Sequence, residues 1–211
     1  MSTNETSVET LAETVVVKPK ILYFGTSVVL VGTTNEDGTP NLAPMSSAWA
    51  LGDSIVLGLI SVGQTIENLQ RTGECTLNHP SPEHWEMVER IGSLTARQPV
   101  PAWLESKNFV SSREKFEISG FTPIPSEIVA PPRAAECRLQ IEAKLEGVLP
   151  LQAEMGGAEG GAVAAAVRAV RVHAGCGALM RGFGHEPRLR GQNPPETTNI
   201  CRYLGHLERP S

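Results

Sequence analysis

The sequence predicts a single, mainly β domain with a few short helices. Runs of β-branched and apolar residues lie between turn-forming residues, as at 27–34 and 54–60, which is typical of short strands. Segment 137–145 alternates apolar and polar residues at period two, as a half-exposed strand does. A chain of 211 residues with 40% hydrophobic content is long enough to close one sizeable core.

The first three expected strands form an antiparallel unit. Segment 27–34 is dense in β-branched residues and runs into 35–38, whose residues tolerate turn geometry. Segment 40–49 then completes a hairpin, and its two prolines fit an edge or bulged strand better than a central one. The apolar run 54–60 predicts a third, buried antiparallel strand.

Two short helices follow, separated by one strand. Thr65 is the expected N-cap of the first helix, and Gly73 is its expected C′ residue. Segment 74–78 then predicts a fourth strand. Ser81, followed by proline, is the expected N-cap of a helix that runs to about Ile91.

The second half is less regular. Segment 93–132 holds many of the 16 prolines and predicts a long loop that carries one short helix around 113–118. We interpret 163–173 as a strand that pairs with 137–145 across a glycine-rich turn at 156–161, although its alanine content also allows a helix. Those glycines do not form the Gly-x-Gly-x-x-Gly pattern that opens a dinucleotide-binding helix.

Composition excludes several functions. The net charge of -5 gives no basic face for nucleic acid, and no apolar run approaches the roughly 20 residues that a membrane helix needs. Segment 1–14 is acidic and has no signal-peptide core, so we expect a cytoplasmic protein. The cysteines are widely spaced, which predicts free thiols and no metal site: Cys75, Cys137, Cys176 and Cys201.

The start of the first helix is the best candidate binding site. A helix that directly follows a strand presents unpaired backbone N–H groups and a positive dipole end to a phosphate. Thr65 and Asn68 offer further donors, although Thr65 can equally be a simple cap and Asn68 a turn residue. The adjoining hairpin adds polar groups and one aromatic side chain, which suit a phosphorylated heterocycle: Asn41, Ser46, Ser47 and Trp49.

With these residues in place, the chain resembles a known family. From Lys18 to about Leu145 it is similar to the flavin reductase-like family of FMN-binding split barrels. Four pieces in the same order carry the resemblance: 19–26, 35–49, 65–69 and 116–123.

The resemblance implies a six-stranded Greek-key split β-barrel that forms a homodimer with FMN at the subunit interface. The expected organisation is a disordered acidic tail at 1–17, the barrel at 18–180 and a divergent C-terminal tail at 181–211. Segment 168–173 fits the closing strand of the family, whereas 191–198 is polar where relatives tend to carry a tryptophan and an apolar run.

The resemblance also implies the cofactor site. The segment that matches 41–49 lies along the isoalloxazine ring and ribityl chain, and the one that matches 61–68 receives the phosphate. Gln64 stands where many relatives have a basic residue, so the phosphate is expected to rest more on backbone amides. The residues implied in FMN binding are Asn41, Met45, Ser46, Ser47, Ala48, Trp49, Ser61, Gln64, Thr65 and Asn68.

The expected function is that of an FMN-binding oxidoreductase. It would use NADH or NADPH to reduce FMN, or pass electrons to a small acceptor or a partner monooxygenase. The alternatives are a non-catalytic FMN carrier and a flavoenzyme that acts on another small substrate in the same pocket. Backbone N–H groups near Ser47 and Ala48 would support charge on the reduced flavin. His173 is the best histidine candidate for a proton donor, but no catalytic side chain is assigned.

Overall fold

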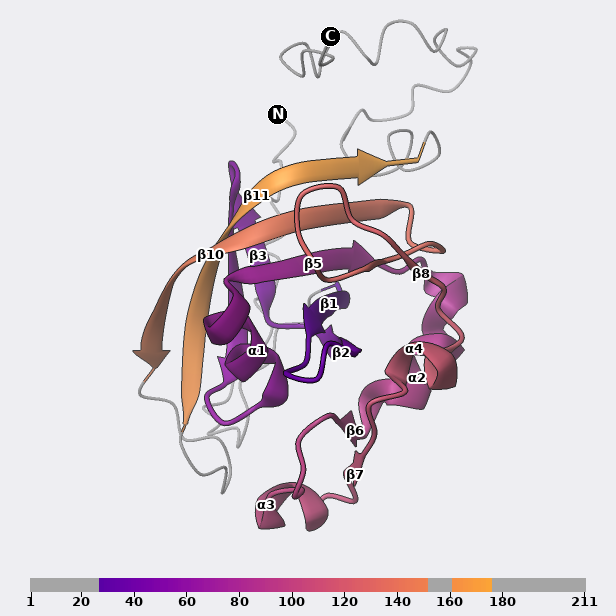
Figure 1. Ribbon diagram of the computed structural model, residues 1–211, viewed down its shortest axis with the longest axis vertical. Coiled ribbons are helices and arrows are strands. Elements are labelled where there is room, and N and C mark those ends of the chain that lie inside the picture. Colours follow the sequence, from indigo (N-terminus) through magenta and orange to yellow (C-terminus); the bar gives the residue numbers. More distant parts are fainter. Residues whose placement is uncertain (1–26, 152–160, 176–211) are drawn as a thin grey trace, which may run out of the picture.

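The computed structural model describes residues 27–151 and 161–175, and its centre is one seven-stranded antiparallel sheet (Figure 1). The order of strands across the sheet is β2, β1, β5, β10, β11, β4, β3. Their bounds are β1 Val29–Thr34, β2 Pro40–Met45, β3 Ala48–Leu51, β4 Ser54–Ile60, β5 Glu74–His79, β10 Leu139–Leu151 and β11 Ala162–Ala174.

The two end strands of this sheet, β2 and β3, are consecutive in the chain. Only Ser46 and Ser47 separate them, and β2 pairs with β1 while β3 pairs with β4. The sheet therefore curls until its two ends meet at this crossing. The expected six-stranded barrel is corrected to a seven-stranded sheet, because segment 40–49 breaks at the serines and its halves pair with opposite ends of the sheet.

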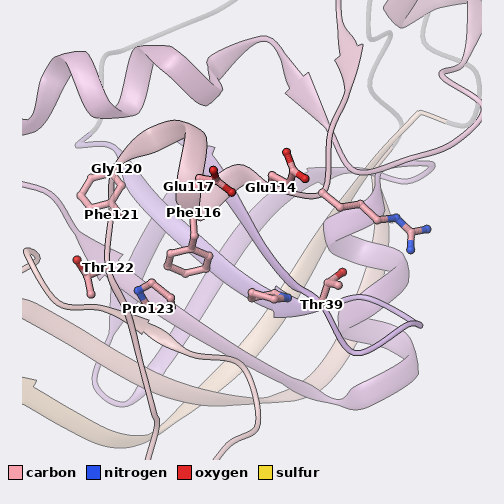
Figure 2. A pocket seen from close by; sticks show the side chains of 10 residues that line it. Thr39, Glu114, Phe116, Glu117, Gly120, Phe121, Thr122 and Pro123 are labelled. Carbon is pink, nitrogen blue, oxygen red and sulfur yellow. The ribbon is translucent and has the colours of Figure 1, made fainter.

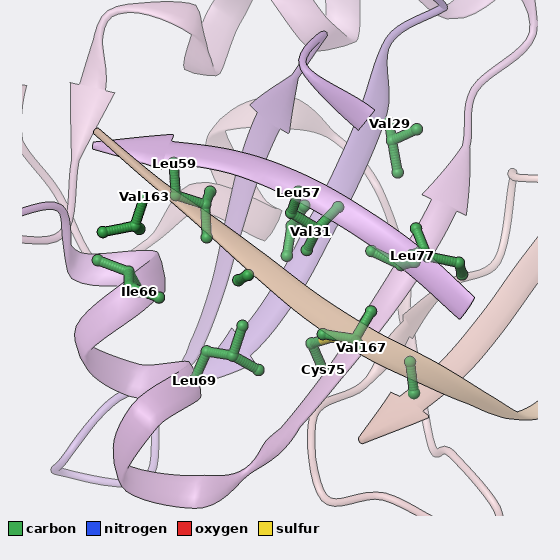
Figure 3. Close-up of a cluster of buried hydrophobic side chains, with 13 residues drawn as sticks. Val29, Val31, Leu57, Leu59, Ile66, Leu69, Cys75, Leu77, Val163 and Val167 are labelled. Atoms are coloured by element: carbon green, nitrogen blue, oxygen red, sulfur yellow. The ribbon is translucent and has the colours of Figure 1, made fainter. Parts of the chain in front are cut away.

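The main core lies between the curled sheet and helix α1 (Gln64–Thr72) (Figure 3). Ile66 and Leu69 of α1 are buried against side chains from β1, β4, β5 and β11. The helix begins earlier than expected, because its N-cap is Gly63 and Thr65 lies inside the first turn. Its end agrees with the prediction, since Gly73 adopts a left-handed conformation with φ of 71°.

A second core lies on the other side of β1 and β2. The helix expected from Ser81 is a 3₁₀ turn (Pro82–His84) followed by α2 (Trp85–Gly92), and α4 (Lys115–Ser119) packs beside it. The buried side chains of this cluster include Leu30, Leu42, Ile91, Phe116 and Phe121.

Segment 93–132 contains more structure than the single helix expected for it. Two-residue strands β6 (Leu94–Thr95) and β7 (Val110–Ser111) pair in parallel, with α3 (Ala102–Glu105) between them. We call residues 94–111 the arm, because Figure 1 shows it projecting away from the sheet. Beyond the arm, β8 (Pro123–Ile124) pairs with β9 (Arg133–Ala134).

The strand preferred for 163–173 is confirmed as β11, which pairs with both β10 and β4. The glycine-rich turn and both expected tails fall mostly or wholly outside the described residues. Cys75 and Cys137 are buried free thiols. In the described part of the chain, no helix has the length and apolar character needed to cross a membrane.

Candidate functional site

The site predicted from the sequence gathers where the β2–β3 crossing meets the end of β4. The N–H of Gly58 donates to the carbonyl oxygen of Ser47 at 2.6 Å. A Cβ on Gly58 would lie 2.8 Å from the Cβ of Ser47, so this contact requires a residue without a side chain. The crossing is therefore held tightly against β4, whose chain continues directly into α1.

A buried polar network joins the hairpin to the start of α1. The amide nitrogen of Asn41 donates to Thr33 Oγ1 at 3.0 Å and to Thr65 Oγ1 at 3.4 Å. Asn68 donates to the same Thr33 oxygen at 3.1 Å and to Asn35 Oδ1 at 2.9 Å. Gln64 Nε2 donates to Asn68 Oδ1 at 2.9 Å. Four of the expected site residues are thus brought together.

Asn41 and Asn68, which were expected to contact the cofactor, are both buried within this network. Asn41 and Asn68 have exposed fractions of 1% and 0%, so in this structure they brace the site from beneath. Asn41 Oδ1 is buried without a hydrogen-bond partner among the described residues. An unsatisfied buried acceptor is costly, and a hydroxyl group or a water molecule would satisfy it. A polyol chain is a ligand with hydroxyls of that kind.

The crossing presents fewer side chains than its sequence suggests. Met45 and Ala48 pack against the main core, and Ser46 is half-buried. Ser47 is exposed, and Trp49 is 60% exposed rather than in the core, where a lone strand tryptophan is usually found. Ser47 and Trp49 are therefore the side chains of this segment that a ligand would meet.

The amino end of α1 is open. The N–H groups of Gln64, Thr65 and Ile66 donate to no acceptor among the described residues, and the N-cap Gly63 has no side chain to supply one. Ser61 is bound to Gly161, because its N–H and its Oγ donate to the Gly161 carbonyl oxygen at 3.2 and 3.3 Å. Open N–H groups at a helix start are suited to an anion.

Three arginines that the sequence reasoning missed lie beside this helix. Arg71, Arg97 and Arg113 line one polar cavity of about 300 Å³ together with Gln64 and Asn68. Next to Thr65 the sequence itself offers only the uncharged Gln64. Arg71 belongs to α1 itself, but no local motif indicates that Arg97 and Arg113, 33 and 49 residues after Gln64, return to this helix.

The model of the flavin reductase like domain family matches residues 21–182. The chain belongs to this family.

Curated relatives match part of this chain. The uncharacterized protein YdfE of Bacillus subtilis (strain 168) is 47% identical over 132 residues, which are 63% of this chain and 64% of YdfE. An uncharacterized protein of Halalkalibacterium halodurans is 30% identical over 146 residues, 65% of this chain and 61% of the relative. This chain therefore matches less than two thirds of the length of these relatives.

Solved structures of the family share the fold. Flavoredoxin of Desulfovibrio vulgaris (Miyazaki F) superimposes with a TM-score of 0.59 at 22% identity, covering 77% of both chains. Component B of nitrilotriacetate monooxygenase from Bacillus cereus gives a TM-score of 0.58 at 18% identity, covering 77% of this chain and 82% of that one. A structure described as a flavin reductase with a split-barrel domain, from Shewanella frigidimarina, gives 0.54 at 23% identity, with 72% and 68% coverage.

Apart from the predicted FMN site, an apolar cavity of about 490 Å³ opens between α4 and the start of β2 (Figure 2). Phe116, Phe121 and Pro123 line it, and Figure 2 shows Thr39 at its opposite edge. Arg113 lines this cavity and the polar one, so the two are neighbours.

His173, the best histidine candidate from the sequence, is committed to structure. Its Nε2 lies 2.7 Å from Glu142 Oε1, and Glu142 is fully buried. Burial by itself raises the pKa of the Glu142 carboxyl. Hydrogen bonds from the N–H of Glu127, from His173 and from the N–H groups of Ile128 and Val129 outweigh this effect and lower that pKa to about 2. Glu142 and His173 therefore hold a loop in place.

Proposed function

We propose that this chain is an FMN-dependent oxidoreductase that takes reducing equivalents from NADH or NADPH. It passes them to free flavin, to a small acceptor or to a partner monooxygenase. The observation that carries the proposal is the meeting of the β2–β3 crossing with the open amino end of α1, in a chain of the flavin reductase-like family.

The residues present fit the cofactor in three places. Ser47 and Trp49 are exposed at the crossing, where the isoalloxazine ring would lie. The unsatisfied Asn41 Oδ1 is an acceptor for a ribityl hydroxyl or for a water that bridges to one. The N–H groups of Gln64 and Thr65 face the phosphate position. When bound, the flavin supplies the hydride and electron transfer.

In this proposal the protein contributes binding and orientation. Met45 and Ala48 hold the crossing by packing against the core, so they present backbone groups to the ring. Asn68 braces the network and Ser61 anchors the turn before the helix through the Gly161 carbonyl. We assign no proton transfer to a side chain, because His173 is bound to the buried Glu142.

We also propose a homodimer with the flavin at the subunit interface, in the cytoplasm. The outer face of β3, β4, β11 and β10 supports the dimer, because two of its cross-strand rows are apolar. One row joins Trp49, Val56 and Ala166, and the next joins Gly58, Ala164 and Leu149. Trp49 and Leu149 are 60% and 65% exposed in the single chain, and contiguous exposed apolar surface marks an interaction site.

The test starts with the visible spectrum of the purified protein with and without added FMN. Oxidation of NADH and NADPH is then followed in the same sample. Flavin bands on the protein, with oxidation above the free-flavin background, are the expected result. FMN binding without oxidation of NADH or NADPH would indicate an FMN carrier instead of a reductase. If a product then forms from another substrate only with bound flavin, the protein is a flavoenzyme for that substrate. Absence of flavin binding would overturn the proposal.

A further inference from the structure

Three guanidinium groups from separate segments face the polar cavity beside α1. Arg71 comes from the last turn of α1, Arg97 from the arm, and Arg113 from the segment between β7 and α4. The cavity has a volume of about 300 Å³ and is otherwise lined by polar side chains: Glu36, Gln64, Glu67, Asn68 and Gln98.

Each arginine is fixed by an acceptor and keeps donors for a ligand. Arg97 Nη1 donates to the Val62 carbonyl oxygen at 2.7 Å and to Glu67 Oε2 at 3.1 Å. Arg71 donates to the Thr34 carbonyl oxygen through Nη2, and Arg113 to an Asp37 carboxylate oxygen through Nη1. A guanidinium carries five N–H donors on three nitrogens, and two nitrogens of each group donate to no acceptor in the described part of the chain.

Arg97 is the best placed of the three to serve the start of α1. Val62 immediately precedes Gly63, the N-cap of the helix, so the bond to its carbonyl fixes the Arg97 guanidinium next to the open N–H groups. Gln64 offers no charge at this position. Arg97 of the arm therefore supplies a positive charge close to Thr65, where the neighbouring residue in sequence, Gln64, has none.

Three acidic neighbours oppose the charge of the three arginines. Glu36 and Glu67 line the cavity, and Asp37 pairs with Arg113. Hydrogen bonds from the Thr39 side chain and backbone lower the pKa of Asp37 to about 2, so it stays ionised. The Glu67 side chain is 57% exposed, and exposed ion pairs are weak. A phosphate dianion with two bidentate arginine contacts competes effectively with such a partner.

We infer that Arg97, supported by Arg71 and Arg113, binds the phosphate monoester of the flavin and selects FMN over riboflavin. The inference rests on the proposed function. It assigns this role to residues outside the segment 61–68 that the resemblance indicated. It also ties the arm to the cofactor, because Arg97 belongs to the arm and contacts the helix start.

The experiment compares dissociation constants for FMN and riboflavin, which share the ring and the ribityl chain but differ in the phosphate. Fluorescence quenching of the flavin measures both. Arg97→Gln is expected to weaken FMN binding by about 10- to 100-fold, the value of a charge-assisted hydrogen bond, and to leave riboflavin binding unchanged. Arg97→Lys, which keeps the charge but cannot bridge two acceptors and a ligand, should lose part of the affinity.

Two further variants provide controls. Glu67→Gln breaks the same ion pair but leaves Arg97 without its competitor, so FMN should bind a few-fold more tightly. Arg138→Gln removes one exposed positive charge outside the cavity and should change neither constant. Thermal unfolding of each variant shows whether the fold is kept.

The outcomes separate the inference from the function it rests on. Equal weakening of FMN and riboflavin by Arg97→Gln, or no weakening of either, overturns the inference while flavin binding stands. A loss confined to NADPH relative to NADH also overturns it, because the cavity would then bind the phosphate of the nicotinamide cofactor. Wild-type protein that binds neither flavin overturns both.

Discussion

Glu142 shows how a single buried carboxylate can replace regular structure. It accepts hydrogen bonds from the N–H groups of Glu127, Ile128 and Val129 at 2.9, 2.6 and 3.1 Å. His173 completes its surroundings at 2.7 Å. These three N–H groups belong to a loop that pairs with no strand among the described residues. The Glu142 carboxylate therefore takes the place of the backbone carbonyl groups that would accept these hydrogen bonds in a β-sheet.

The pKa of Glu142 gives this anchor a pH dependence. A folded-state pKa of about 2, below the ordinary 4.5, means that the stabilisation is fully present above about pH 4.5. It is lost as the pH falls toward 2, because the unfolded chain takes up the proton first. The shift corresponds to about 3 kcal/mol of unfolding free energy.

Glu142→Gln should therefore lower the unfolding free energy at pH 7 by about 2–4 kcal/mol, and should flatten its fall between pH 5 and pH 3. Urea unfolding at several pH values measures both. Glu146→Gln on the same strand removes an exposed partner of Arg168, and should cost less than about 1 kcal/mol. Equal losses in the two variants would contradict the role of Glu142.

Single residues also mark the limit of sequence reasoning. Local signals for a helix start predicted that Thr65 and Asn68 belong to this element, and both lie in α1. Their burial is set by Thr33, Asn35 and Asn41, which lie 24 to 35 residues away in sequence. Exposure and hydrogen-bond partners of this kind depend on tertiary packing, and no local pattern indicates them.

Among the elements, strands were predicted best where one face is buried. The alternation at 137–145 predicted the first part of β10, and β-branched runs predicted β1 and β4. The arm was not predicted, because β6 and β7 have two residues each and pair across a 14-residue connection. Strands of two residues are too short to show the alternation of apolar and polar residues by which a strand is predicted.

The β2–β3 crossing depends on Gly58, and this dependence can be tested. Gly58→Ala places a Cβ 2.8 Å from Ser47 Cβ and 3.4 Å from its carbonyl oxygen, so the crossing must move away from β4. We expect a loss of about 1–3 kcal/mol in unfolding free energy and weaker binding of both FMN and riboflavin. Urea unfolding and flavin fluorescence measure the two effects.

Gly147→Ala is the matched control for this prediction. Gly147 is also a strand glycine, but a Cβ there meets nothing within 4 Å. The unfolding free energy of the Gly147→Ala variant should stay the same or rise slightly. If Gly58→Ala bound flavin like the wild type, the crossing would not be part of the flavin site.

At the scale of the whole molecule, the curled sheet has one apolar face that no other described segment covers. Leu51 is 77% exposed at the end strand β3, and Leu149 is 65% exposed on β10. Between them run Val56 and the alanines of β11, whose small side chains allow another surface to approach closely. A second copy that buries this face would also cover the outer edge of β3, which pairs with no strand among the described residues.

Light scattering should therefore give about twice the chain mass of 22.6 kDa for the wild type. Leu149→Lys places a charge on the patch that the dimer would bury and should weaken dimerisation by about tenfold or more. Leu51→Lys should act in the same direction, while Ile118→Lys, at a 38% exposed residue of α4, should leave the dimer intact. A dimer that tolerates both leucine variants would place the interface elsewhere. A monomeric wild type would remove the dimer, and the flavin would then have to bind within one chain.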